Sequence, residues 1–196
     1  MSSPRRQGRV FVISGPSGGG KTTVVERLVQ GVPWMNRSVS VTTRAPRLGE
    51  RRGRAYRFVS SGQFHRLRRA GRLLEWAKVH GAYYGTPKAP VLAALGAGRD
   101  VVLSIDVQGA RQVRRALGPR AVLVFLKPPS LAQLRQRLRR RRTDTPAAIS
   151  RRMAAARKEL ACAAWYDYTV VNDRLAQAVR DVQAIVTAER RSQREG

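Results

Sequence analysis

Short apolar runs alternate along this chain with stretches in which apolar residues recur at helical spacing. A strand that is covered on both faces is largely apolar, so the runs predict strands at 10–13, 100–106, 121–126 and 168–172. Between these runs the spacing predicts helices over 21–31, 109–116, from 131 onward and over 175–188. Alternating strands and helices indicate an α/β fold with a doubly wound parallel sheet.

The pattern changes between residues 36 and 88. Apolar and polar residues alternate there in SVSVTT (38–43), YRFVS (56–60) and LLEWAKV (73–79), and a short helical pattern lies around Gln63 to Ala70. Alternation with a period of two is typical of strands with one covered face. The sequence therefore predicts a small mixed β subdomain inserted into the α/β unit.

The first predicted strand runs into the segment GPSGGGKT, Gly15 to Thr22, which has the spacing of a phosphate-binding loop. Glycines leave the backbone N–H groups free to turn toward phosphate oxygens, and the following helix adds the positive end of its dipole. Lys21 is then placed to reach the β- and γ-phosphates, and the Thr22 hydroxyl is placed to ligate Mg²⁺. The alternative is a glycine-rich turn that binds nothing.

Composition points to one basic domain. The chain has 196 residues, and 39 Lys and Arg against 12 Asp and Glu give a formal net charge of +27. Such a charge indicates a polyanionic partner, either phosphorylated small molecules or nucleic acid. Arginine preference from genome composition and solvated helix faces are the plainer explanations, and no aromatic-rich RNA-binding signature accompanies the charge.

Signals for export, disulfides and membranes are missing from this pattern. The longest apolar run, 121–126, is far shorter than a membrane span, and the first strand begins near residue 10. Cys162 is the single cysteine, which excludes an intrachain disulfide and predicts a packed helix residue. We therefore expect a cytoplasmic protein without membrane contact.

Several polar residues in and beside the inserted subdomain are candidates for binding a substrate. Arg44 and Arg47, followed by Glu50 and Tyr56, suit a phosphate clamp because each guanidinium offers a planar fork of donors. Ordinary surface charge is the alternative for the two arginines. Asp106 ends a predicted strand, where ligands of doubly wound sheets bind, so it is a candidate for substrate or for the magnesium shell. A helix N-cap is the alternative for Asp106.

A second basic segment lies further along the chain. RQRLRRRR (135–142) precedes TDTP (143–146), which is a helix-start signal, and a helix that carries Arg151, Arg152 and Arg157 follows. This order predicts a mobile lid on a helical hairpin. A nucleic-acid-binding helix and a merely solvated basic helix are the alternatives.

Several stretches in order resemble the guanylate kinase family, from Arg9 to about Ala188. They are GPSGGGKTT, SVSVTTRAPRLGERRGRAYRFVS, LLEWAKVHGAYYGT, IDVQGA, FLKPPSLAQLRQRL and VVN. The resemblance implies Mg²⁺-dependent phosphoryl transfer from ATP to GMP, giving ADP and GDP. It also implies a core of 9–35, 89–134 and 160–190, a GMP-binding subdomain of 36–88 and a lid of 135–159.

The resemblance also assigns residues to each substrate. For GMP or dGMP it implies Ser40, Arg44, Arg47, Glu50, Tyr56, Glu75, Tyr84, Thr86 and Asp106. For ATP it implies Gly15, Pro16, Ser17, Gly18, Gly19, Gly20, Lys21, Thr22 and Thr23, with Asn172 near the adenine. The groups that stabilise the transferring phosphoryl are then Lys21, Arg44, Arg137, Arg141 and Arg152, with Mg²⁺ on Thr22 and Asp106 in its outer shell.

Glu75 is the residue expected to select the base. Guanine presents N1–H and the 2-amino group as adjacent donors, and an ionised carboxylate accepts both. Adenine has a bare N1 acceptor at that place, so it would face the lone pairs of the carboxylate. We expect Ser40 and Thr86 to support Glu75 in this role.

Two departures from the family pattern affect these expectations. Ser104 stands where relatives commonly have an acidic residue two positions before Asp106, which predicts a weaker outer magnesium shell and reduced activity. The lid segment of relatives usually reads RGRGT, whereas this chain has four arginines before Thr143. Two glycines that allow bending are thus arginines here, which predicts altered lid closure.

Two other functions compete with the kinase. A phosphopeptide-binding module on the same scaffold would have no need of an ATP site, so Lys21 in its glycine-rich loop argues against it. A basic nucleic-acid-binding protein would show strongly salt-dependent binding. The sequence leaves the oligomeric state open.

Overall fold

The computed structural model describes residues 7–46, 53, 56–140 and 145–195. Its chain divides into two compact units, Met1–Val10 with Trp34–Val122 and Phe11–Pro33 with Leu123–Gly196. Arg47, Glu50 and Arg141, which the resemblance assigns to the substrates, lie outside the described residues.

The larger sheet has the strand order of a doubly wound fold. Across the sheet it contains β2 (Met35–Arg37), β7 (Asp100–Ser104), β1 (Val10–Ser14), β8 (Ala121–Lys127) and β9 (Tyr168–Val171). Strands β2 and β7 pair in parallel, as do β8 and β9. Later strands thus lie on both sides of β1, which is where the strand order reverses. The predicted α/β fold class is confirmed.

The first unit also holds a smaller mixed sheet. Its order is β4 (Tyr56–Phe58), β3 (Ser40–Thr42), β6 (Ala82–Pro87) and β5 (Leu73–Val79). Strand β3 is parallel to β4 and antiparallel to β6, and β6 is antiparallel to β5. The helices of this unit are α2 (Ser61–Arg69), α3 (Lys88–Gly96) and α4 (Val107–Leu117), followed by the 3₁₀ turn η1 (Gly118–Arg120).

The β5–β6 hairpin is fixed by its turn. His80 and Gly81 both have positive φ, 49° and 88°, which is the backbone of the tight two-residue turn that suits the twist of hairpin strands. This turn sets the register in which Glu75 of β5 lies opposite Thr86 of β6. A slip of one residue would move one of these side chains to the other face of the sheet.

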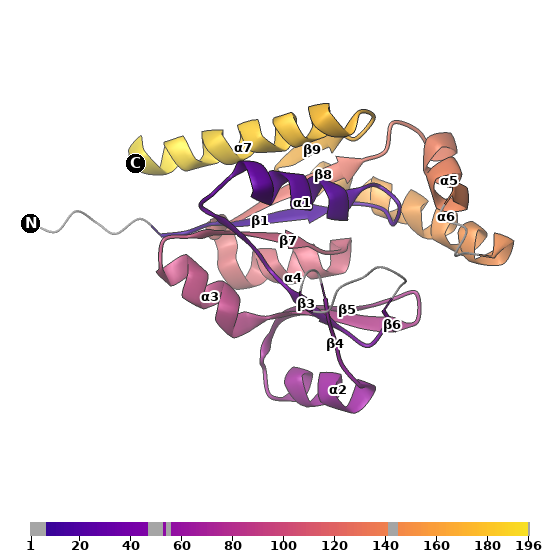
Figure 1. Ribbon diagram of the computed structural model, residues 1–196, viewed down its shortest axis with the longest axis horizontal. Coiled ribbons are helices and arrows are strands. Elements are labelled where there is room, and N and C mark those ends of the chain that lie inside the picture. Colours follow the sequence, from indigo (N-terminus) through magenta and orange to yellow (C-terminus); the bar gives the residue numbers. More distant parts are fainter. Residues whose placement is uncertain (1–6, 47–52, 54–55, 141–144, 196) are drawn as a thin grey trace, which may run out of the picture. The chain divides into compact units, whose positions relative to one another are not determined.

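The second unit contains the remaining helices. They are α1 (Lys21–Gly31), α5 (Leu131–Arg140), α6 (Pro146–Ala161) and α7 (Leu175–Glu195), with the 3₁₀ turn η2 (Cys162–Trp165). Helix α7 packs against α1 and β9 (Figure 1). Cys162, predicted as a packed helix residue, is half-buried at the start of η2.

Helices α5 and α6 form the hairpin that the basic segment predicts (Figure 1). Leu134 and Leu138 of α5 are buried against Ile149 and Ala156 of α6, so the hairpin has an apolar core of its own. Helix α6 begins after Thr145, whose hydroxyl accepts from the Ala148 N–H at 3.3 Å. The predicted helix start at residues 143–146 is therefore confirmed at Thr145 and Pro146.

The core of the molecule follows the predicted apolar runs. Every residue of β1 is buried, and so are residues 121–126 of β8. The sequence pattern did not predict β2, β6 and α3, and α7 continues past 188 to Glu195. Helix α3 has apolar residues on its exposed side as well as its buried side, since Leu92 is 38% exposed while Val91 and Leu95 are buried. Apolar and polar positions therefore do not alternate with the helical period, and the sequence pattern does not reveal this helix.

Candidate active site

The phosphate loop lies between β1 and α1 in the second unit. Gly15, Gly18 and Gly20 have φ of 137°, 90° and 92°, a region that favours glycine. A Cβ at Gly15 would also overlap the Leu126 carbonyl, so the loop passes against β8 with no room for a side chain. Gly20 precedes α1 and gives it no side-chain cap, and the N-terminus of a helix is a favourable place for an anion.

Lys21 and two arginines of the hairpin lie at or beside this loop. The Lys21 ammonium donates to the carbonyl oxygens of Gly15 at 2.6 Å and Pro16 at 3.1 Å, so it spans the loop. Arg152 of α6 donates to the Ser17 hydroxyl at 3.4 Å. Arg137 of α5 donates instead to the Asn172 carbonyl at 2.9 Å. The structure thus brings Lys21 and Arg152 to the loop and holds Arg137 on the segment after β9.

Glu75 is the buried acid of the first unit. Its side chain is 2% exposed, and its Oε1 accepts a hydrogen bond from the Thr86 hydroxyl at 2.6 Å across the hairpin. Its Oε2 lies against Gly109 in the first turn of α4, where a Cβ would overlap that oxygen. A glycine at 109 therefore makes room for the carboxylate at the positive end of α4.

The surroundings of Glu75 make its ionisation costly. Burial disfavours the charged form and raises the pKa of Glu75 from 4.5 to about 7, with a smaller contribution of the same sign from Asp106. The hydrogen bond from Thr86 acts in the opposite direction. The carboxyl group therefore changes its charge near neutral pH.

Asp106 is the N-cap of α4. Its Oδ1 accepts from the Gly109 N–H at 2.9 Å, and its Oδ2 accepts from the Gln108 amide at 3.0 Å. Asp106 is therefore a helix N-cap, which the sequence analysis gave as the alternative. A role of Asp106 in substrate or metal binding stays a prediction.

Three predicted phosphate-binding side chains meet on the smaller sheet. The Arg44 Nε donates to the Tyr84 hydroxyl at 3.2 Å, and the guanidinium carbon lies 5.5 Å from the centre of the Tyr56 ring. Tyr56 and Tyr84 contact edge to face at 5.9 Å. Thr42 orients this group, because its hydroxyl accepts from the Arg44 N–H at 3.2 Å and donates to the Tyr83 carbonyl at 2.9 Å. Ser40, also predicted for this substrate, is buried at the start of β3.

The guanylate kinase family model matches residues 7–189 of this chain. The chain belongs to the guanylate kinase family. It is 52% identical over 181 residues to a guanylate kinase of Gloeobacter violaceus, with 92% of this chain and 88% of that protein covered. A guanylate kinase of Dechloromonas aromatica is 49% identical over 181 residues, with 92% and 89% covered.

A solved structure of the guanylate kinase family has the same fold. The crystal structure of guanylate kinase from Anaplasma phagocytophilum aligns with a TM-score of 0.81 and 32% sequence identity, covering 94% of this chain and 87% of that chain. The predicted resemblance to the family is thereby confirmed over nearly all of the chain.

Gln112 of α4 is a supporting residue that the sequence analysis missed. Its Oε1 accepts from the Trp76 N–H at 3.2 Å, and its Nε2 donates to the Trp76 carbonyl at 2.7 Å. Strand β5 is an edge strand, so Gln112 pairs with the outer backbone groups of the residue next to Glu75. A signal was available in the four-residue spacing of Gln108 and Gln112, which puts both on one side of α4.

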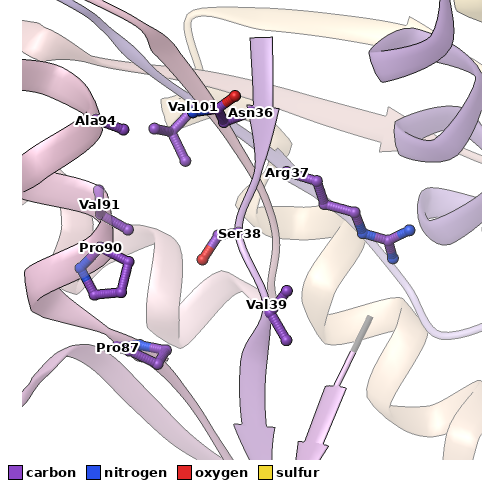
Figure 2. A pocket seen from close by; sticks show the side chains of 9 residues that line it. All are labelled: Asn36, Arg37, Ser38, Val39, Pro87, Pro90, Val91, Ala94 and Val101. Atoms are coloured by element: carbon purple, nitrogen blue, oxygen red, sulfur yellow. The ribbon is translucent and has the colours of Figure 1, made fainter. Parts of the chain in front are cut away.

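A cavity of about 410 Å³ in the first unit lies apart from these residues. Figure 2 shows the Ser38 hydroxyl directed toward Pro90, whereas the Arg37 side chain extends away from Pro90. The residues that line the cavity are Asn36, Arg37, Ser38, Val39, Pro87, Pro90, Val91, Ala94 and Val101. None of the predicted substrate residues is in this set, so the cavity is not the predicted nucleotide site.

The described part of the chain shows neither of two other kinds of site. It contains no helix with the length and apolar character needed to cross a membrane. Nor do residues 7–46, 53, 56–140 and 145–195 gather three or more His, Cys, Asp or Glu side chains in a group that could hold a metal ion.

Proposed function

We propose that this member of the guanylate kinase family transfers the γ-phosphoryl group of ATP to GMP and forms ADP and GDP. The observation that carries the proposal is the buried Glu75 carboxylate, hydrogen-bonded to Thr86 and lying against Gly109. A buried ionised acid is costly unless hydrogen-bond donors compensate its charge. The burial of Glu75 therefore supports a binding site for a ligand that presents two adjacent donors.

Guanine fits this requirement through its Watson–Crick edge. The N1–H and the 2-amino group would donate to Glu75, while the Thr86 hydroxyl holds one carboxylate oxygen in place. Hypoxanthine keeps N1–H and lacks the amino group, and adenine has no donor at N1. Sites built around such a hydrogen bond reject analogues that lack the donor by roughly 10⁴–10⁵.

Arg44, Tyr84 and Tyr56 are proposed to hold the phosphate of GMP. Their contacts already fix the Arg44 guanidinium beside a phenol, so a phosphate would meet two kinds of donor without reordering long side chains. Arg47 and Glu50 remain candidates for the same group on the ground of the resemblance.

The phosphate loop, Lys21 and Arg152 are proposed for the ATP side. An oxygen of the GMP phosphate would bond to the γ-phosphorus as the bond from that phosphorus to the β–γ bridging oxygen breaks, leaving ADP. Such a transfer needs positioned cations more than a general base, so Lys21 and the hairpin arginines supply charge stabilisation.

Mg²⁺ fits this donor set. The cation keeps water and phosphate oxygens and takes few protein ligands, so a single hydroxyl beside the phosphates is a suitable ligand. The exposed Thr22 hydroxyl in the first turn of α1 would hold it. When bound, the ion neutralises the charge of the β- and γ-phosphate oxygens.

The test is ADP production from ATP and Mg²⁺ with GMP, IMP or AMP as the acceptor. We expect kcat/KM to fall in the order GMP, IMP, AMP, and Glu75→Gln to compress this order by weakening GMP. Asp181→Asn, which removes a carboxylate from α7, is the matched control and should leave the order unchanged. Equal rates with GMP and AMP in the wild type would refute the proposal.

A further inference from the structure

Asn172 follows β9 and is fixed on three sides. Its N–H donates to the Lys127 carbonyl at 2.8 Å, which continues the pairing of β8 and β9 by one residue. Its carbonyl accepts from Arg137 at 2.9 Å. Asn172 is only 5% exposed, and its Nδ2 donates to the Gly19 carbonyl at 2.8 Å.

This side-chain bond reaches the middle of the phosphate loop. The Gly19 N–H is already held by the Pro16 carbonyl at 2.9 Å, so both backbone groups of Gly19 have protein partners. In a trans peptide the carbonyl and the next N–H point in opposite directions. A Gly19 carbonyl held toward Asn172 therefore turns the Gly20 N–H to the opposite face of the loop.

Gly20 adds a second constraint at the same place. Its φ of 92° is in the left-handed region, and a Cβ there would overlap the Asn172 amide nitrogen. The amide of Asn172 therefore packs directly on Gly20 while it bonds to Gly19. The peptide between these glycines is held by one side chain from the far end of the chain.

We propose that Asn172 is a positioning residue of the phosphate loop, which holds the Gly19 carbonyl so that the Gly20 N–H faces the polyphosphate of the nucleotide. The inference deepens the proposed function on its ATP side. It differs from the adenine contact that the family resemblance implies, because a residue that acts through the loop affects every polyphosphate, with or without a base.

The experiment compares two ligands by calorimetry in the presence of Mg²⁺. ATP carries adenine, and inorganic tripolyphosphate carries the same chain of phosphates without a base. A buried hydrogen bond of this kind is worth about tenfold in binding, so Asn172→Ala should raise Kd about tenfold for both ligands. Val171→Ala, at the exposed neighbouring position, is the matched control and should change neither Kd.

Two readouts separate this role from a general loss of structure. Binding of GMP to Asn172→Ala should remain at the wild-type value, because the Glu75 site belongs to the first unit. In the wild type the Gly20 amide proton should shift in the NMR spectrum when tripolyphosphate is added, and this shift should be smaller in the variant. Asn172→Ser, which is too short to reach Gly19, takes the place of the alanine variant if that one does not fold.

The outcomes are distinct. A weaker Kd for ATP with an unchanged Kd for tripolyphosphate would assign Asn172 to the adenine and overturn the inference. Unchanged affinity for both ligands would also overturn it, while the proposed kinase function would stand. A wild-type protein that binds neither ligand would overturn the proposed function together with the inference.

Discussion

Replacing Glu75 with glutamine should make the ligand-free protein more stable at neutral and alkaline pH. The Glu75 carboxyl is buried beside Asp106, and its pKa rises from 4.5 to about 7 on folding. Glutamine has nearly the same shape and can still accept from Thr86, but it never carries the charge that burial penalises.

The size and sign of the effect follow from that pKa. Between pH 4.5 and 7 the native state keeps the Glu75 proton more firmly than the unfolded chain, so the free energy of unfolding falls as the pH rises. The loss is complete above pH 7 and amounts to about 3 kcal/mol. Below pH 4.5 both states are protonated and the penalty vanishes.

Urea unfolding followed by circular dichroism, at several pH values from 4 to 8, measures this difference. The free energy of unfolding of Glu75→Gln minus that of the wild type should increase by about 3 kcal/mol across the range, with most of the change between pH 4.5 and 7. Asp181→Asn should give a flat difference. If the difference for Glu75→Gln is also independent of pH, the pKa of Glu75 does not rise on folding and the reasoning is wrong.

Three further changes test other parts of the site. Lys21→Ala should lower kcat by roughly 10²–10³ or more without unfolding the protein, because it removes a cation that we propose to stabilise the transferring phosphoryl, and near-normal turnover would exclude that role. In a cysteine-free background, dyes at Ser150 on α6 and Gln30 on α1 should move closer when ATP is added, since the nucleotide neutralises the hairpin arginines, and an unchanged distance would argue against lid closure. Gly109→Ala should raise KM for GMP at least tenfold with a smaller change in kcat, because the methyl group displaces the Glu75 carboxylate; steady-state kinetics check this, and an unchanged KM would contradict the close contact.

Local sequence pattern was sufficient where one physical effect dominates. Residues 10–13 and 121–126 are apolar at every position because both faces of their strands are covered, and they form strands as predicted. Helix α1 has the predicted bounds, since the loop glycines precede it and Gly31 with Pro33 ends it. Arg44 meets Tyr56 and Tyr84, two residues that the resemblance places on the same substrate.

Long-range contacts were beyond the reach of the sequence. Gln112 bonds to a residue 36 positions away, and Asn172 bonds to one that is 153 positions away. The closeness of Glu75 to Gly109 likewise depends on how β5 packs against α4. Helix propensity and spacing describe single elements, whereas these contacts arise only when two elements are packed together.

The contact between Glu75 and Gly109 also constrains how this protein can change during evolution. While an acid of this length stands at 75, any side chain at 109 must displace its carboxylate, so the two positions do not vary independently. Loss of the carboxylate would relieve the fold of a buried charge. Position 109 then becomes open to alanine or larger residues. The geometry of one carboxylate thus couples the substitutions that two distant positions can accept.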